Sequence, residues 1–455
     1  MYFLGVPTTR ALSCVMSSDT VPRDIKYNGN IKNEKCTVVV RLSPTFIRFG
    51  SFQLALKNEY NAKRGGDPKN FDRRMINELA DYTIKHFYPQ YANLEKIESY
   101  TQFLLEVANR TLDLFVKWQG IGFIHGVLNT DNMSILGVTI DYGPYGFMEY
   151  FDDFQVINTS DEWGRYAYKK QPEIAKWNLN KLFECFADIL PKESKKQLND
   201  RLSTFEEEAS VKINELICKK LGLLYPVKSL TLTSLLKDCI EYSRTDWTNF
   251  FLTLEKFHDF ESLAQNPTDF FTELWKITPS FNQWIKANTP SIPDSTLESL
   301  LGNKNMQAFM AMQYGHFPEA YLQNQMSKSD ARRQAVDDGQ DGWREDVQDR
   351  WTQWLVVYAD HIKQDKLRYS EESSGGDLGQ KYQEERTKIL TKTNPAFILR
   401  NHLVQDAIEK AEADDFTEVE ALLKLSCNPY DRNIEPKYQR MPSECSGDIC
   451  LSCSS

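Results

Sequence analysis

Apolar side chains recur at helical spacing through residues 95–118. They form a single stripe, which consists of Ile97, Tyr100, Leu104, Val107, Ala108, Thr111, Leu114, Phe115 and Trp118. Side chains three and four positions apart share one face of an α-helix, so the stripe predicts a helix that buries this face in the protein core. The helix should end near Gln119-Gly120 and lead the chain directly into a polar loop at residue 124.

The segment before this helix has the shorter period of β-strands. Strand-like runs at residues 11–16 and 35–40 flank a turn sequence, Tyr27-Asn28-Gly29-Asn30. This arrangement predicts a small β-rich part at the start of the chain.

The segments after the polar loop are mostly helical in pattern. Residues 177–325 have apolar and aromatic positions typical of packed helices, and Trp343, Val347, Trp351, Trp354 and Leu355 form another helix face. Two polar stretches, 327–342 and 369–379, are predicted to be loops. The pattern therefore predicts an α/β (α+β) fold with a small β-rich part and a large, mostly helical part.

The polar loop carries the residues of greatest chemical interest. It reads Ile124-His125-Gly126-Val127-Leu128-Asn129-Thr130-Asp131-Asn132-Met133-Ser134-Ile135, and Ile140-Asp141-Tyr142-Gly143-Pro144 follows after a short gap. Protein kinases place their two magnesium ligands in this way, on the Asn of H-R-D-x-x-x-x-N and the Asp of D-F-G. Asn132 and Asp141 fit these two positions, so the order predicts a Mg²⁺ and ATP site.

The position of the kinase base is altered. Five residues before Asn132 stands Val127, whose aliphatic side chain cannot accept a proton. Asp131 is the nearby carboxylate that could replace it as the general base. Asp-Asn alone is usually an Asx turn and Asp-Tyr-Gly alone a strand end, but their combination after His-Gly favours a metal site.

Two arginines, Arg41 and Arg48, flank residues 42–47 near the predicted hinge to the helical part. A guanidinium group suits phosphate because it donates parallel hydrogen bonds, although the spacing alone favours solvated arginines at a strand end. Arg165 follows the loop region and either orients a phosphate or, as is commoner, pairs with Asp152 or Asp153.

Composition restricts the possible functions. The net charge of -10 and the pI near 5.3 argue against broad nucleic-acid binding, and no apolar run reaches the about eighteen residues of a membrane span. The start of the chain lacks the features of a signal peptide. The tail, residues 433–455, carries Cys450 and Cys453 at C-x-x-C spacing, which suits a reversible disulfide better than a zinc site.

Several longer motifs resemble those of the selenoprotein O family from the first residues to the last. They are Gly5-Val6-Pro7-Thr8-Thr9-Arg10, Phe46-Ile47-Arg48-Phe49-Gly50, the run from His125 to Ser134, Asp141-Tyr142-Gly143-Pro144, Gly164-Arg165-Tyr166 with Gln171-Pro172, and Asn394-Pro395 with Leu399-Arg400-Asn401.

The resemblance implies a protein-kinase-like two-lobe fold and transfer of AMP from Mg-ATP to Ser, Thr or Tyr hydroxyls of proteins. It implies Asp131 as proton acceptor, Asn132 and Asp141 as Mg²⁺ ligands, and Arg41 and Arg48 as nucleotide contacts. It also implies a mitochondrial location for eukaryotic members. These carry selenocysteine third from the end, where this chain has Cys453, either a true cysteine or a selenocysteine written as one.

The resemblance also implies a departure at the front of the chain. Family members carry an upstream glycine-rich segment with an ATP-contacting Lys, and this chain starts after it, so we expect a truncated product without its targeting segment. We expect residues 1–52 to be the remainder of the small lobe, 53–432 the large lobe with catalytic loop 124–144, and 433–455 a flexible tail. A non-catalytic scaffold, a small-molecule kinase and a redox-linked regulator remain alternatives.

Overall fold

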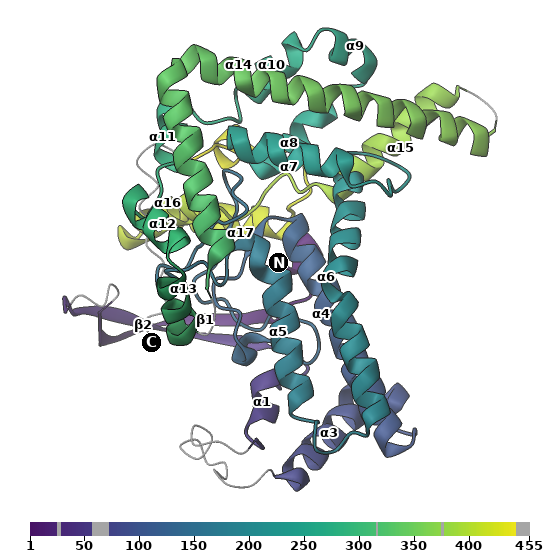
Figure 1. Cartoon of the computed structure of the whole chain (residues 1–455), viewed down its shortest axis with the longest axis vertical. Coiled ribbons are helices and arrows are strands. Elements are labelled where there is room, and N and C mark those ends of the chain that lie inside the picture. Colours follow the sequence, from purple (N-terminus) through teal and green to yellow (C-terminus); the bar gives the residue numbers. More distant parts are fainter. Residues whose placement is uncertain (25–28, 57–71, 315–316, 375–376, 443–455) are drawn as a thin grey trace.

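Helices make up most of the protein, and strands are few (Figure 1). The structure is a computed structural model that describes residues 1–24, 29–56, 72–314, 317–374 and 377–442. Within these ranges the strands form two small antiparallel sheets, each of two strands. The fold class predicted from the pattern, α/β with a large helical part, is confirmed at this level.

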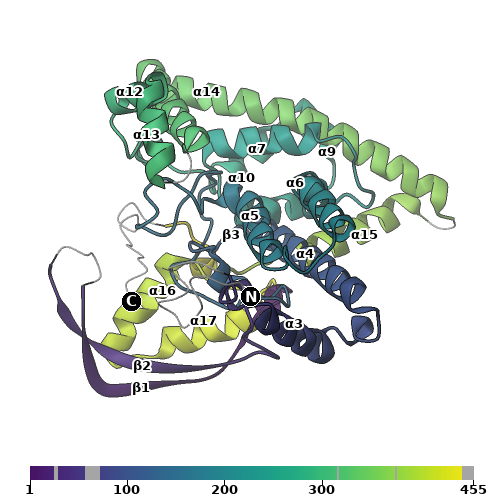
Figure 2. The ribbon, with the colours of Figure 1, turned by 60° about the horizontal axis from the view of Figure 1, so that its bottom comes forward.

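The first sheet is a long hairpin of β1 (Arg10–Arg23) and β2 (Lys32–Leu42). The predicted strands at 11–16 and 35–40 are confirmed and extend further, while part of the predicted turn between them lies outside the described residues. Figure 2 shows the hairpin at one edge of the molecule, near α16 and α17. Apolar side chains of both strands are exposed, among them Leu12, Val15, Met16, Val38 and Val39.

The predicted amphipathic helix is confirmed as α4 (Lys96–Gly120). The Glu95 carboxylate caps its first turn by accepting hydrogen bonds from two backbone N–H groups. The face that carries Tyr100, Leu104, Val107, Phe115 and Trp118 is buried in one of two large apolar clusters. Helix α4 thus forms the support on which the polar loop after it rests.

The helices between the polar loop and residue 314 pack in three apolar clusters. One surrounds α4, a second is rich in aromatic residues, and a smaller third consists of Leu297, Leu300, Met310 and Leu322. They are α5 (Gln171–Glu184), α6 (Lys192–Lys220), α7 (Thr231–Ser243), α8 (Trp247–Thr253), α9 (Phe260–Gln265), α10 (Thr268–Leu274), α11 (Phe281–Ala287), α12 (Asp294–Gly302) and α13 (Lys304–Tyr314). The other helices are α1 (Phe49–Gln53), α3 (Arg73–Phe87), α14 (Glu319–Glu372), α15 (Leu378–Thr393), α16 (Asn401–Glu412) and α17 (Thr417–Cys427).

The prediction of a loop at 327–342 is wrong, because this stretch lies inside α14, the long helix at the top of Figure 1. Helix α14 consists of two helical pieces that meet at a kink at Gly339, where φ is 73° and ψ is -179°. Polar contacts hold this part of the helix: Lys328 donates to Asp152 at 2.6 Å, and Ser329 donates to Asp294 at 2.7 Å. Such polar contacts with residues distant in the sequence produce no apolar periodicity, so the pattern does not predict this helix.

The second predicted loop, 369–379, is wrong at both of its ends. Helix α14 continues to Glu372, and α15 begins at Leu378 with the Asp377 carboxylate as its N-cap. The Trp343, Trp351 and Trp354 face of α14 is buried as predicted.

Candidate active site

The polar loop is held between the two short strands of the second sheet. Strand β3 (Phe123–Ile124) follows α4 and pairs with β4 (Gly146–Phe147), so the residues between them form a loop whose two ends are joined by this strand pair. Both strands are buried. Between Met133 and Ile140 the backbone forms an isolated antiparallel bridge from Met133 to Thr139.

The side-chain amide of Asn132 has a fixed orientation. Its Nδ2 donates a hydrogen bond of 2.9 Å to the backbone carbonyl of Val127. Because the nitrogen is used in this bond, Oδ1 is the atom left to bind a cation. This is the orientation that the predicted metal role of Asn132 requires.

Asp131 lies in a short 3₁₀ turn, Thr130–Asn132, where its N–H donates to the Asn129 side chain at 3.0 Å. The Asx turn is therefore present, and it leaves the carboxylate of Asp131 on the side of α1. A Cβ atom added to Gly50 would lie 2.1 Å from Asp131 Oδ1, so the carboxylate rests directly on the backbone of α1. A side chain at position 50 would displace it.

Asp141 and Arg41 line one cavity of about 560 Å³. The Arg41 guanidinium also donates to the Ile140 carbonyl, which fixes it beside the segment that carries Asp141. The other walls include residues 1–4 and 8–11, residues 397–399 and the end of α17. An arginine and a carboxylate in one cavity suit a phosphate group and the cation that accompanies it.

The structure does not bring all predicted site residues into that cavity. Asp131, Asn132 and Arg48 are absent from its lining. Arg48 pairs with Ser134 through an isolated β-bridge and immediately precedes α1, where its N–H donates to Ser51 Oγ at 3.3 Å. Arg48 is thus placed on the Asp131 side of the loop, whereas Arg41 is on the Asp141 side.

His125 supports the loop from within. It is buried, its Nδ1 accepts a hydrogen bond of 3.4 Å from the Val127 N–H, and its ring lies 5.3 Å from that of Trp118. Burial lowers the pKa of His125 to about 4, although the nearby Asp141 carboxylate opposes the shift. A histidine that is neutral at pH 7 and already bonded to the backbone has a structural role here.

Two residues that hold the loop were given no role from the sequence, where Gln171 stands only as part of a family motif. Gln171 is buried at the start of α5; its Oε1 accepts from the His125 N–H at 3.0 Å, and its Nε2 donates to the Phe123 carbonyl at 3.0 Å. Further along the same helix, buried Asn178 donates to the Leu128 carbonyl at 2.8 Å. The only signal in the sequence is a pair of amides on the apolar side of a helix.

The ion pair expected of Arg165 does not form with either proposed partner. Asp152 binds Lys328 at 2.6 Å, and Asp153 binds Lys169 at 3.1 Å. The first pair joins the segment after the loop to α14, and the second joins two parts of that segment. The Arg165 guanidinium lies elsewhere, on the surface of α5.

The chemistry of the donors fits Mg²⁺. This ion prefers oxygen ligands and is usually held by one or two carboxylates together with waters and substrate phosphates. The Asp141 carboxylate and the Asn132 amide oxygen are of this kind. Within the described residues no cluster of three or more His, Cys, Asp or Glu side chains could hold a metal.

Comparison with known proteins identifies the class and then the family. The sequence pattern of the family described as "Protein adenylyltransferase SelO" matches residues 1–427. The chain is 34% identical to "Protein adenylyltransferase SelO, mitochondrial" of Mus musculus, over 100% of this chain and 69% of the relative. It is 36% identical to the Homo sapiens protein of the same name, over 94% of this chain and 63% of the relative.

Bacterial proteins are also similar. "Protein nucleotidyltransferase YdiU" of Flavobacterium johnsoniae is 31% identical over 97% of this chain and 67% of its own length. The chain therefore belongs to the SelO family of protein adenylyltransferases, and the predicted resemblance is confirmed. It spans 69%, 63% and 62% of the three mitochondrial relatives from mouse, human and Danio rerio. No helix in the described ranges is both long and apolar enough to cross a membrane.

Proposed function

We propose that this chain transfers AMP from Mg-ATP to Ser, Thr or Tyr hydroxyl groups of proteins. Family membership is the observation that carries the proposal, since relatives along nearly the whole chain are named protein adenylyltransferases. The local geometry supports it, because Val127 occupies the position of the kinase base while Asn132 keeps the orientation of a metal ligand.

In the proposed reaction the hydroxyl oxygen of the substrate protein attacks the α-phosphorus of ATP. The bond between the α-phosphorus and the oxygen that bridges to the β-phosphorus breaks, and pyrophosphate leaves with the electron pair. Asp131 accepts the hydroxyl proton as general base. Its place against Gly50 fixes the carboxylate on a rigid turn.

The remaining roles concern the nucleotide. Asn132 and Asp141 would hold Mg²⁺, which when bound neutralises phosphate charge. Arg41 and Arg48 would bind phosphate oxygens from the two sides of the loop and balance the charge of the leaving pyrophosphate. Arg41 is supported by the cavity that it shares with Asp141.

The finer architecture belongs to the same proposal. A kinase-like two-lobe arrangement would divide the chain into residues 1–52, 53–432 and 433–455, with the hairpin β1–β2 in the first part. We propose a mitochondrial location, supported by the names of the animal relatives. Cys450 and Cys453, which lie outside the described residues, would form a redox-sensitive pair.

The experiment compares ATP labelled on the α-phosphate with ATP labelled on the γ-phosphate, using a casein mixture as hydroxyl donor. We expect α-label on protein and γ-label in pyrophosphate. Asp131→Asn should lower the rate by about 100-fold or more, the usual contribution of a general base. Asp113→Asn is the matched control, because Asp113 is an exposed aspartate of α4 that pairs with Lys212 at 2.6 Å.

Each other outcome identifies an alternative. Transfer of γ-label to protein would make the chain a kinase, and transfer to a small molecule would make it a small-molecule kinase. ATP binding without transfer of either label would favour the non-catalytic scaffold. An unchanged rate for Asp131→Asn would remove this residue as the base.

A further inference from the structure

A groove of about 1070 Å³ runs along α5, on the side of the helix away from the polar loop. Its walls come from residues 163–180, from α6 and from residues 317–323 at the start of α14. Pockets for small molecules usually enclose about 300–1000 Å³, so this groove has room for several residues of an extended polypeptide.

Arg165 and Trp177 form the most distinctive feature of the groove. The Arg165 guanidinium carbon lies 4.8 Å from the centre of the Trp177 ring, and the Trp177 side chain is 41% exposed. A guanidinium that stacks on an indole keeps its N–H edge free to bind an anion. In the described part of the chain no carboxylate pairs with the Arg165 side chain.

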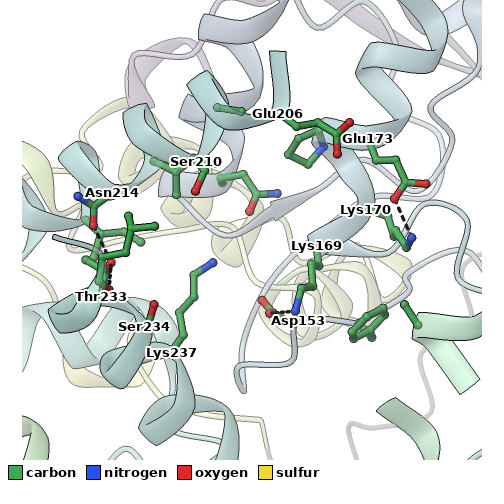
Figure 3. Close-up of a pocket in the computed structure, with 18 residues that line it drawn as sticks. Asp153, Lys169, Lys170, Glu173, Glu206, Ser210, Asn214, Thr233, Ser234 and Lys237 are labelled. Carbon is green, nitrogen blue, oxygen red and sulfur yellow. Dashed lines mark hydrogen bonds and ion pairs between the residues drawn. The ribbon is translucent and has the colours of Figure 1, made fainter. Parts of the chain in front are cut away.

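The other cations of the groove are neutralised. Lys170 pairs with Glu173, and Lys176 pairs with Glu206, each at 2.7 Å. Figure 3 shows the adjoining cavity of about 380 Å³, where the Lys170–Glu173 pair is drawn together with the pair of Asp153 and Lys169. Among the cations that line the groove, Arg165 is thus the one for which the described residues show no ion pair.

The lining of the groove also includes apolar side chains and the carboxylate of Glu319. Trp163, Phe317 and Tyr321 lie along the groove beside Trp177. The Glu319 carboxylate accepts a hydrogen bond of 3.0 Å from Gln323 Nε2. Aromatic surface next to a free guanidinium favours a ligand that has an apolar group beside an acidic one.

The position of the groove connects it to the candidate active site. Helix α5 presents Trp177 to the groove, while Gln171 and Asn178 of the same helix bond to the backbone of the polar loop. A polypeptide in the groove is thus one helix away from the loop that carries Asp131.

We propose that this groove docks an extended segment of the protein substrate that carries an acidic side chain next to an aromatic or aliphatic one. The carboxylate binds Arg165, and the apolar neighbour packs on Trp177. The inference rests on the proposed transfer of AMP to proteins, and it adds the class of sequence that the enzyme recognises.

The test measures binding without nucleotide. A fluorescein-labelled random Glu/Tyr copolymer and a Lys/Tyr copolymer of the same length are titrated with the protein, and anisotropy is recorded. We expect the Glu/Tyr copolymer to bind more tightly. Arg165→Gln should weaken its binding at least about ten-fold, a loss of about 1.4 kcal/mol. Arg165→Lys, which keeps the charge but not the planar fork, should give an intermediate loss.

Arg344→Gln is the matched control. Arg344 also stacks on a tryptophan, Trp275, with the guanidinium carbon 5.3 Å from the ring centre, but neither residue lines the groove. Equal binding by Arg165→Gln and Arg344→Gln would overturn the proposal, and so would equal affinity for the two copolymers. A melting curve confirms that each variant is folded, and Arg165→Lys supplies the test if the glutamine variant is not.

A transfer assay separates this proposal from the proposed function. Arg165→Gln should raise the KM for the Glu/Tyr copolymer at least about ten-fold and leave the KM for ATP unchanged. Arg165-dependent binding without any AMP transfer refutes the proposed activity and leaves the docking groove. AMP transfer with an unchanged KM in Arg165→Gln refutes the groove and leaves the activity.

Discussion

Gly126 should be the least replaceable residue of the polar loop. Its φ of 80° lies in the left-handed region, and a Cβ atom placed there would lie 2.0 Å from the carbonyl oxygen of Pro144. Pro144 belongs to the segment that carries Asp141. The absence of a side chain at position 126 therefore allows the two halves of the candidate site to touch.

The expected cost of Gly126→Ala has two parts. A non-glycine residue in the left-handed region loses about 1–2 kcal/mol. Overpacking against a neighbour that cannot rotate away adds about 1–3 kcal/mol, and Pro144 contributes backbone at the contact. We therefore expect a loss of about 2–5 kcal/mol in the free energy of unfolding.

Gly5→Ala is the matched control, because Gly5 has nearly the same φ, 78°, and a Cβ there would meet nothing within 4 Å. This variant should lose the conformational part alone, about 1–2 kcal/mol. Urea denaturation followed by tryptophan fluorescence measures both losses. Gly126→Ala should also weaken Mg-ATP binding in calorimetry, whereas Gly5→Ala should not. Equal losses of stability in the two variants would refute the reasoning that the loop and the Pro144 carbonyl are in contact.

Three further predictions concern other parts of the chain. Lys220 is buried, and burial lowers its pKa from 10.5 to about 7. Between pH 7 and pH 10.5 the unfolded chain therefore binds a proton at Lys220 that the folded chain does not bind. Stability should thus fall as the pH decreases from about 10.5 to about 7, by up to about 1.4 kcal/mol per unit, and Lys220→Met should remove this slope in urea titrations. Arg400 and Asp246 form a buried ion pair at 2.6 Å, so Arg400→Met should lower the free energy of unfolding by about 3–5 kcal/mol. Adding Asp246→Asn should recover part of this loss, and equal stability of the single and double variants would contradict the role of the pair. Cys450 and Cys453 should form a reversible disulfide, so non-reducing mass spectrometry should find the C-terminal peptide about two mass units lighter, and free thiols in oxidising buffer would contradict this.

The sequence predicted those elements whose stability comes from a regular apolar face. The stripe of α4 and the tryptophan face of α14 belong to this kind, and both are buried as expected. Residues 327–342 do not, since Lys328 and Ser329 stabilise the helix through Asp152 and Asp294, far away in the sequence. A polar stretch with such partners cannot be distinguished from a loop by its own pattern.

The candidate site was predictable to the same degree. Spacing was enough to propose Asn132, because the kinase motif fixes the number of residues between the base and the metal-binding Asn, whereas Asp141 was proposed from the Asp-Tyr-Gly that follows the loop. Spacing did not show that Arg41 shares a cavity with Asp141 while Arg48 does not, since the fold of the hairpin decides this. Gln171 stands in a family motif, but its role was not predicted, because its bonds go to backbone atoms and backbone groups leave no mark in a sequence.

The same backbone bonds explain why the shape of the loop does not depend on the side chain at position 127. Asn132 donates to the carbonyl of Val127, and the N–H of Val127 donates to His125, so neither bond uses the side chain at position 127. Gln171 binds the backbone of the loop in the same way. A buried amide that lost such a partner would cost about 1–3 kcal/mol, which makes the backbone path of the loop a strong requirement of the fold. The side chain at position 127 carries no such requirement, and it can therefore change while the Asn132 side chain keeps its bond to the backbone.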